Sequence, residues 1–170
     1  MPRLHVCSLS LIGAKVEETG ARRLVTLLST GTHVERPRAI APEHHLYIAM
    51  SDIVEPAVGQ IVPGKRHVRT LLEFVRDWNR AEPMLIHCFA GVSRSTAAAF
   101  IAACALNPSR SEAEIARAIR VASPTATPNA RLVALGDAIL ERNGRMSAAI
   151  EAIGRGDECF EGVPFALELG

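Results

Sequence analysis

The 170-residue chain contains no long run of apolar residues. A membrane-spanning helix needs roughly 20 such residues in succession, so the sequence predicts no membrane segment. The chain also has no excess of either charge, because 19 Lys and Arg are balanced by 18 Asp and Glu, for a formal net charge of +1. Without a basic surface to attract phosphates, we expect no binding to nucleic acid or to a membrane.

Cysteines are few and widely separated. The four residues Cys7, Cys88, Cys104 and Cys159 form no CxxC pair, and no Cys or His pair has zinc-finger spacing. Scattered cysteines of this kind are typical of reduced thiols rather than of a disulfide framework. We therefore expect a cytoplasmic protein without a metal ion or other cofactor, in which Cys7 and Cys104 belong to the core.

The chain has no internal repeats and no low-complexity linker, and we predict a single domain over residues 1–170, with an unassigned tail from residue 154. Short apolar segments bounded by turn residues predict strands, and apolar periodicity with capping residues predicts helices. The predicted strands are Leu4–Leu9, Leu24–Leu28, Leu46–Ala49 and Met84–His87. The predicted helices are Lys65–Arg80, Ser95–Leu106, a capping-box helix from Ser111 to Val121, a helix from the N-cap Asn129 to Arg142, and Ser147–Ile153. The segment Gly13–Gly20 is predicted to form a short acidic helix or a turn.

Strands alternate with helices along the chain, which favours an α/β domain of three layers, α/β/α, with a small, mostly parallel central sheet. Ligands bind such sheets at the carboxyl ends of the strands. Two connections fall at that edge, the 15-residue segment 50–64 and the loop that starts at Cys88. A loop as long as the first is usually functional in a compact domain.

One segment joins a buried strand to an apolar helix and reads HCFAGVSRS, residues 87–95. The first N–H groups of a helix have no intrahelical partner and favour an anion. Small residues such as Ala90 and Gly91 allow successive N–H groups to turn inward. Arg94, six residues after Cys88, can donate two hydrogen bonds to one tetrahedral oxyanion. This segment is therefore predicted to bind a phosphoryl group.

The thiol of Cys88 lies in the same positive electrostatic field of the helix N–H groups and Arg94. A thiol at a helix N-terminus beside a cation ionises readily, and the thiolate is a strong nucleophile. Cys88 is therefore predicted to attack the bound phosphoryl group and form a phosphocysteine. Ser95 can donate its hydroxyl to the sulfur when water releases the phosphate, and can also cap the helix. We expect His87 to lie behind the loop and hydrogen-bond its backbone.

His87–Ser95 resembles the HC-x5-R-[ST] loop of the cysteine-dependent protein tyrosine phosphatases, and in detail that of the dual-specificity branch. The resemblance extends from about Leu24 to Leu140 and includes the Pro128-Asn129 step. It implies a protein tyrosine phosphatase-like fold and the hydrolysis of phosphorylated proteins or small phosphoesters. It also implies a general acid in a mobile loop upstream of the cysteine. Asp52 occupies that place, with Glu55 as the nearest rival acid and a loop-capping role as the alternative for Asp52.

The predicted phosphate-binding residues are Phe89, Ala90, Gly91, Val92, Ser93 and Arg94. No residue between Cys88 and Arg94 is charged, whereas superfamily members that act on phosphoinositides tend to carry basic residues there. Apolar Phe89 and Val92 instead favour phosphotyrosine and aryl phosphates. Phosphoserine and phosphothreonine stay open as substrates. Arg66 and Arg69 are expected on a solvated face of the predicted helix, with a place at the positive rim of the site as the alternative.

Two other classes of protein use a similar anion loop. A phospho-residue binding module would bind without turnover, but such a module normally lacks the cysteine or the arginine, and this chain has both. A sulfur-transfer or arsenate-reducing enzyme also uses a cysteine in a short anion loop, and the Gly-x-Ser-Arg-Ser ending and the upstream Asp52 argue against it. The oligomeric state and the physiological substrate stay open.

Overall fold

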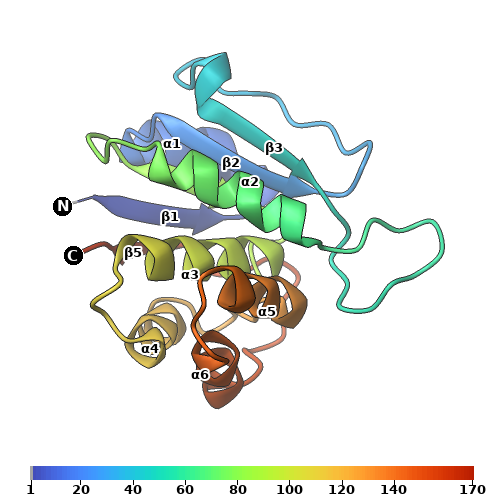
Figure 1. Ribbon diagram of the computed structural model, residues 1–170. Helices are drawn as coiled ribbons and strands as arrows, with labels where there is room; N and C mark the ends of the chain where they lie inside the picture. The colour runs from blue at the N-terminus through green and yellow to red at the C-terminus, as the bar shows by residue number, and fades with distance from the viewer. Residues whose placement is uncertain (1) are drawn as a thin grey trace.

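A five-stranded sheet forms the middle of the molecule in the computed structural model, which describes residues 2–170 (Figure 1). The spatial order is β3-β2-β4-β1-β5, and all neighbours are parallel except β1 and β5. The prediction of a mostly parallel sheet is confirmed. The strands are β1 (Arg3–Cys7), β2 (Arg23–Leu28), β3 (His45–Ala49), β4 (Met84–His87) and β5 (Phe165–Glu168).

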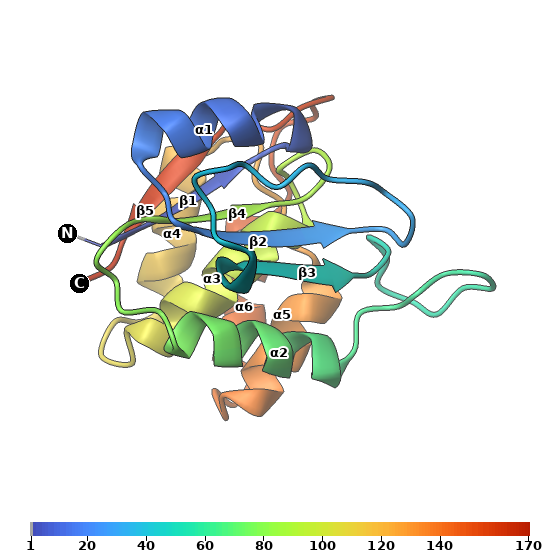
Figure 2. The ribbon, with the colours of Figure 1, turned by 90° about the horizontal axis from the view of Figure 1, so that it is seen from above.

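Helices cover both faces of this sheet, which confirms the predicted three layers (Figure 2). Helix α1 covers one face, and the other five helices lie on the opposite side, where α2, α3 and α4 contact strands and α5 and α6 pack on those helices. The helices are α1 (Ile12–Thr19), α2 (Lys65–Arg76), α3 (Arg94–Leu106), α4 (Glu112–Ala122), α5 (Ala130–Ile139) and α6 (Arg145–Ile153), with 3₁₀ turns at Leu9–Leu11 and Pro42–His44. No helix within residues 2–170 has the length and apolar character needed to cross a membrane.

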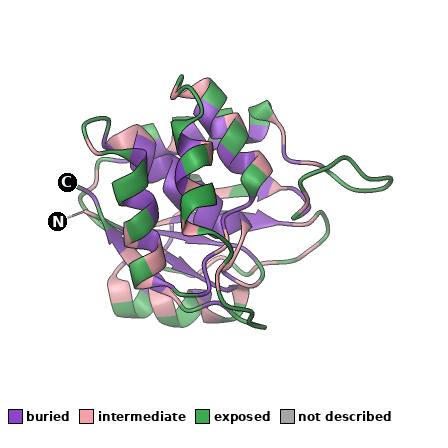
Figure 3. Ribbon diagram, turned by 90° about the horizontal axis from the view of Figure 1, so that it is seen from below, coloured by how far each residue is buried: buried purple, intermediate pink, exposed green. Residues whose placement is uncertain are grey.

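The core is centred on β4 and α3, which adjoin the loop between them. All four residues of β4 are buried, as are 11 of the 13 residues of α3 (Figure 3). A helix that is buried on nearly all sides needs small residues to let its neighbours approach, and the alanine-rich sequence of α3 supplies them. Gly136 on α5 shows how close the packing is, because a Cβ there would lie 2.8 Å from the side chain of Ile101. The loop at residues 87–95 is therefore carried by two rigid elements.

Helix α2 is shorter than predicted, since it ends at Arg76 rather than Arg80. Trp78 continues the apolar spacing and is buried, but its ring N–H donates to the Glu82 carbonyl at 2.9 Å in the turn that follows. Arg80 has a φ of 62°, which no residue within an α-helix adopts. The apolar spacing thus continues beyond the helix, because the following turn folds back against the same core.

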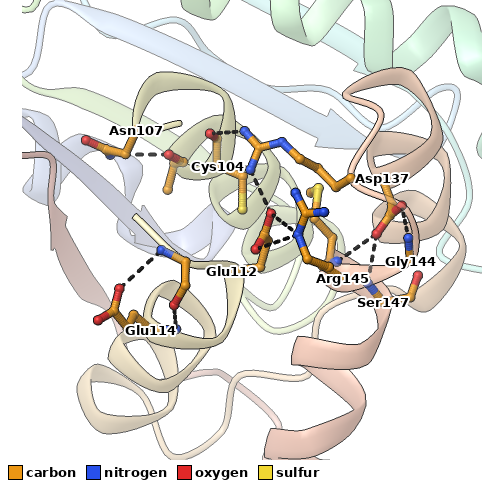
Figure 4. A network of polar contacts seen from close by, with 12 residues as sticks. Cys104, Asn107, Glu112, Glu114, Asp137, Gly144, Arg145 and Ser147 are labelled. Carbon is orange, nitrogen blue, oxygen red and sulfur yellow. Dashed lines mark hydrogen bonds and ion pairs between the residues drawn. The ribbon is translucent and has the colours of Figure 1, made fainter. Parts of the chain in front are cut away.

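Helix α5 is also shorter than predicted, because the sequence predicts that it continues to Arg142. It ends at Ile139, and positive φ angles of 54° at Glu141 and Asn143 turn the chain into α6. The buried Asp137 explains where α6 starts, since its carboxylate accepts hydrogen bonds from the N–H groups at the beginning of that helix (Figure 4). The donors are Gly144, Met146 and Ser147, at 2.7, 2.7 and 3.3 Å.

A buried ion pair joins α4 to the same turn. Glu112 accepts a hydrogen bond from Arg142 at 2.8 Å and also contacts Arg145 (Figure 4). Burial alone would raise the pKa of Glu112, but the hydrogen bond from Arg142 and the charge of Arg145 outweigh it and lower the pKa. The capping box predicted at Ser111 is confirmed, with Glu114 as its partner. These contacts fix the helical side of the molecule.

The first and last segments of the chain differ from the prediction. Strand β1 ends at Cys7, two residues before the predicted end, because the chain turns there into the 3₁₀ helix at Leu9–Leu11. The tail left unassigned from residue 154 returns to the sheet and forms β5, antiparallel to β1. Four residues carry too little pattern to predict such a strand, and its pairing with β1 decides its conformation. Pro2 and Leu169 consequently lie side by side, joined by a backbone hydrogen bond (Figures 1 and 2).

Candidate active site

Cys88 follows β4 directly and is 3% exposed. Its Sγ lies 3.3 Å from the backbone nitrogen of Gly91, which donates to it, and 3.1 Å from Oγ of Ser95 in the first turn of α3. Both groups are able to donate to a negatively charged sulfur. The predicted nucleophile and the predicted partner of its sulfur thus lie in contact.

The backbone of the phosphate loop, residues 88–94, is held from outside by its carbonyl groups. Four N–H groups from other segments donate to four of these carbonyls. Since the C=O and N–H of one peptide unit point in opposite directions, outward carbonyls leave the following N–H groups turned toward the centre of the loop. The pairs are Leu9 with Phe89, Gly162 with Ala90, Thr127 with Val92 and Asn129 with Ser93, at 3.1, 2.8, 2.9 and 3.1 Å.

Two glycines allow the neighbouring chain segments to come this close. Gly91 has a φ of 73°, and a Cβ there would lie 2.8 Å from the backbone of Cys7 and Ser8 at the end of β1. A Cβ on Gly162 would lie 2.6 Å from the carbonyl oxygen of Gly91. The phosphate loop is therefore packed between the end of β1 and the C-terminal tail, with no space for a side chain at either position.

His87 lies fully buried behind the loop. Its Nδ1 is 2.9 Å from the carbonyl oxygen of Cys88, and since a carbonyl only accepts, Nδ1 carries the proton. Its Nε2 then accepts from the Thr26 hydroxyl at 2.7 Å, and Nε2 of His45 donates to that hydroxyl at 2.8 Å. Burial lowers the pKa of His87 to about 4, which keeps the ring neutral in this arrangement. The chain of contacts holds the Cys88 carbonyl away from the phosphate site.

Arg94 is 7% exposed and is anchored through one nitrogen. Its Nη1 donates to the carbonyl of Met50 at 2.9 Å and to Oγ of Ser29 at 3.3 Å. These acceptors follow β3 and β2, so the carboxyl ends of two strands orient the guanidinium group. The buried Nε has no hydrogen-bond partner within residues 2–170. An unpaired buried donor costs about 1–3 kcal/mol, and an oxyanion bound in the loop would remove that cost.

Asp52 lies on the acid loop, residues 50–64, and reaches the rim of the phosphate loop. Its Oδ1 accepts from Oγ of Ser93 at 2.7 Å and from Nδ2 of Asn129 at 2.9 Å. Both contacts use the same oxygen, so Oδ2 takes part in neither. Glu55, the rival acid, is exposed further along the loop and forms no hydrogen bond within residues 2–170. The structure therefore brings Asp52, and not Glu55, to the phosphate loop.

Two residues of the α5 region that the sequence did not single out as site residues hold the acid loop. Asn129 also donates to the carbonyl of Ile53 at 3.2 Å. Arg131 donates from Nε to the carbonyl of Pro63 at 2.7 Å and from Nη1 to that of Val54 at 3.4 Å. The Pro128-Asn129 step was the available signal for the first residue. No sequence signal indicates the contacts of Arg131, because its acceptors are backbone carbonyls 68 and 77 residues away.

The remaining predicted site residues lie around the loop. Phe89 is 54% exposed and lines a cavity of about 310 Å³ together with the exposed Phe160 of the tail. Val92 faces a larger cavity on the other side of the loop. Arg66 and Arg69 are exposed on α2, beyond the acid loop in the chain. The sides of the phosphate loop are thus apolar at Phe89 and Val92.

The other cysteines differ from Cys88 in their surroundings. Cys7 and Cys104 are buried in the core, as predicted, and burial raises the pKa of each thiol to about 12. Such thiols stay protonated and unreactive at neutral pH. Cys159 is exposed on the tail. Within residues 2–170 no three His, Cys, Asp or Glu side chains are grouped so as to hold a metal ion.

Part of the sequence and the whole fold resemble those of known protein phosphatases. The sequence model of the protein-tyrosine phosphatase family matches residues 58–123, which include the whole phosphate loop but not Asp52. No curated protein sequence matches the chain significantly. Three solved structures share its fold, with TM-scores of 0.62, 0.62 and 0.65.

The first of these structures is the PTP-2 phosphatase of Cydia pomonella, which is 18% identical, with 79% of this chain and 84% of that chain covered. The second is human DUSP28, also 18% identical, with 82% and 94% covered. The third is the human tyrosine phosphatase-like serine/threonine/tyrosine-interacting protein, which is 14% identical, with 84% and 94% covered. At these identities the likeness is one of fold.

Proposed function

We propose that the chain is a member of the cysteine-dependent protein tyrosine phosphatase superfamily, whose sequence model matches the segment that holds the phosphate loop. On this premise it hydrolyses phosphate monoesters on proteins, phosphotyrosine above all, through a phosphocysteine. One observation supports this most strongly. Arg94 is fixed through Nη1 while its buried Nε stays unpaired, beside a cysteine and a ring of inward N–H groups. This arrangement suits a tetrahedral dianion and leaves the sulfur below it as the attacking atom.

In the first step, the Cys88 thiolate forms a bond to phosphorus while the bond from phosphorus to the ester oxygen breaks. The loop N–H groups and Arg94 bind the three other phosphoryl oxygens, whose charge they stabilise. Asp52, protonated at this stage, donates its proton to the departing oxygen. The products are the free hydroxyl compound and the phosphocysteine.

In the second step, a water molecule attacks phosphorus and gives a proton to the Asp52 carboxylate. The bond from sulfur to phosphorus breaks, and phosphate leaves. The Ser95 hydroxyl, 3.1 Å from Sγ, donates a hydrogen bond to the departing thiolate. Asp52 thus acts as an acid and then as a base, and ends the cycle protonated as it began.

The preference for phosphotyrosine follows from the sides of the loop. Phe89 is an exposed residue of the loop and offers apolar contact to an aromatic ring. No charged residue lies between Cys88 and Arg94 to bind additional phosphates of a phosphoinositide. We expect a higher kcat/KM for a phosphotyrosine peptide than for a soluble phosphoinositide. A clear preference for the phosphoinositide would assign specificity to Arg66 and Arg69 instead.

The decisive experiment compares Cys88→Ser with Cys159→Ser, a matched change at an exposed cysteine. The first variant should bind p-nitrophenyl phosphate without turning it over, with kcat lower on the order of 10⁶-fold, the scale of removing a nucleophile. The second should keep full activity. Acid quenching of the wild type during turnover, followed by peptide mass analysis, should find a phosphoryl group on Cys88.

Other outcomes separate the alternative functions. Wild-type protein that binds phosphopeptides without any turnover would be a binding module. Turnover of thiosulfate or arsenate, with none of phosphoesters, would indicate sulfur transfer or arsenate reduction. Substantial phosphatase activity in Cys88→Ser would exclude the phosphocysteine.

A further inference from the structure

A cavity of about 820 Å³ opens on the side of the phosphate loop away from Phe89. Its inner end is formed by Asp52, Val92 and Ser93, which belong to the candidate active site. Its outer end is formed by α6 and by residues 154–159 of the tail. A substrate whose phosphate occupies the loop therefore has its neighbouring residues beside this cavity.

The floor of the cavity is apolar, and its outer wall is acidic. Val92, Pro128 and Ile150 contribute the apolar surface. Three carboxylates belong to the outer wall, those of Glu151, Asp157 and Glu158, and all three residues are exposed. An apolar floor below a rim of carboxylates matches a side chain with an aliphatic stem and a cationic end.

One cation also lines this wall, but it already has a partner. Arg155 lies 3.7 Å from Glu158, so these two charges largely cancel in the field of the cavity. Glu151 and Asp157 form no ion pair with any residue between 2 and 170. Their two negative charges at the outer end are therefore not offset by an ion pair.

From this geometry we infer that the cavity binds a Lys or Arg side chain of the phosphoprotein substrate, close in sequence to the phosphorylated residue. The inference rests on the proposed function, and it names the class of substrate for that site. The aliphatic stem of the basic residue lies on Val92, Pro128 and Ile150, and its cationic end faces Glu151 and Asp157. Acidic neighbours of the phosphorylated residue are repelled by the same carboxylates.

Matched phosphotyrosine peptides test this inference. The peptides share one length and differ only in having Arg, Ala or Glu at the positions that flank phosphotyrosine. We expect kcat/KM to fall in the order Arg, Ala, Glu, with roughly 3–10-fold between neighbouring peptides, because exposed ion pairs are individually weak. The differences should shrink as the ionic strength rises from low to high salt.

The double variant Glu151→Gln with Asp157→Asn should abolish the order of the peptides while p-nitrophenyl phosphate is hydrolysed at the wild-type rate. The control is the double variant Glu17→Gln with Glu43→Gln. It removes two exposed carboxylates on α1 and just before β3, at the edge of the sheet opposite the site. This control should keep the order of the peptides.

Measuring peptide binding to the inactive variant Cys88→Ser tests the same preference without turnover. Fluorescence anisotropy with labelled peptides should give the same order in Kd as in kcat/KM. Equal Kd values for the Arg and Glu peptides, or an order unchanged in the Glu151 and Asp157 variant, would overturn the inference. A wild-type protein that prefers the Arg peptide in binding but hydrolyses no phosphoester would overturn the proposed function alone.

Discussion

The phosphate loop, residues 88–94, and the acid loop, residues 50–64, meet at the contact between Ser93 and Asp52. The phosphate loop is held by four backbone N–H groups from three other segments and by glycines that admit no side chain. The acid loop is held from α5 by the side chains of Asn129 and Arg131 and is mostly exposed, as Figure 3 shows. The proposed anion receptor is thus fixed by buried backbone contacts, whereas the proposed proton donor is carried on a largely exposed loop.

The two loops also differ in the free energy with which their contacts hold them. Each hydrogen bond contributes about 0.5–1.5 kcal/mol net, and exposed ones lie at the weak end because water competes for the same groups. A segment with few buried apolar contacts and exposed hydrogen bonds opens at low cost in free energy. Substitutions of the side chains that hold the acid loop should therefore change its position. The phosphate loop should keep its position unless a side chain is added at Gly91 or Gly162.

Arg94→Lys should reduce activity more than any substitution at the acid loop, at Asn129 or at His87. Lysine keeps the charge, but its single nitrogen cannot stay at the Met50 carbonyl and also form the planar two-nitrogen contact with phosphoryl oxygens that a guanidinium forms. We expect kcat/KM for p-nitrophenyl phosphate to fall on the order of 10⁴-fold, within the range seen when an arginine that stabilises phosphoryl transfer is lost. Activity within a few fold of wild type would show that Arg94 does not bind the transferred group.

Asp52→Asn should reduce kcat for phosphotyrosine by on the order of 10²–10³-fold, since general acid catalysis is worth about 10²–10⁴-fold. The loss should be much smaller for an ester whose departing group needs no proton. Glu55→Gln is the matched control on the same loop and should leave the rate unchanged. A reversed result, with the large loss in Glu55→Gln, would assign the acid role to Glu55.

Asn129→Ser tests whether a side chain on α5 positions the acid. Serine is a good N-cap and replaces the contact that Asn129 makes with the N–H of Leu132, but it is too short to reach Asp52. We expect kcat to fall on the order of 10-fold with KM unchanged, below the roughly 10²-fold that a misplacement of about 1 Å can cause. The dependence on the leaving group should steepen and Tm should stay constant. An unchanged leaving-group dependence would contradict the positioning role.

His87→Asn should have the smallest effect on activity at neutral pH, since asparagine can still donate to the Cys88 carbonyl. Its effect is on stability in acid. Between pH 6.5 and about 4, the unfolded chain binds a proton at His87 that the folded chain does not, so the wild type loses free energy of unfolding as the pH falls. The full loss is about 3 kcal/mol. Urea titrations at several pH values should show a flatter dependence in the variant. Equal slopes would show that His87 is not kept neutral.

The sequence alone determined the parts of this protein that depend on neighbouring residues. The strand at Met84–His87, the helix that follows it, the capping box at Ser111 and the N-cap at Asn129 all appear where they were predicted, within a residue. Each is encoded within a few residues, by apolar spacing or by a side chain that reaches its own backbone. The anion-binding segment from Cys88 to Ser95 could be predicted for the same reason, because its functional groups are close together in the sequence.

Only the tertiary structure decided which distant groups surround that segment. Strand β5 exists because β1 offers it an edge, and the unpaired Nε of Arg94 results from anchoring at Ser29 and Met50, which are 65 and 44 residues away. Asn129 reaches Asp52 across 77 positions. Such contacts leave no periodic trace in the sequence, because they depend on how strands and helices are ordered in space. The packing of the whole chain therefore placed the acid, the arginine and the acidic cavity around one loop.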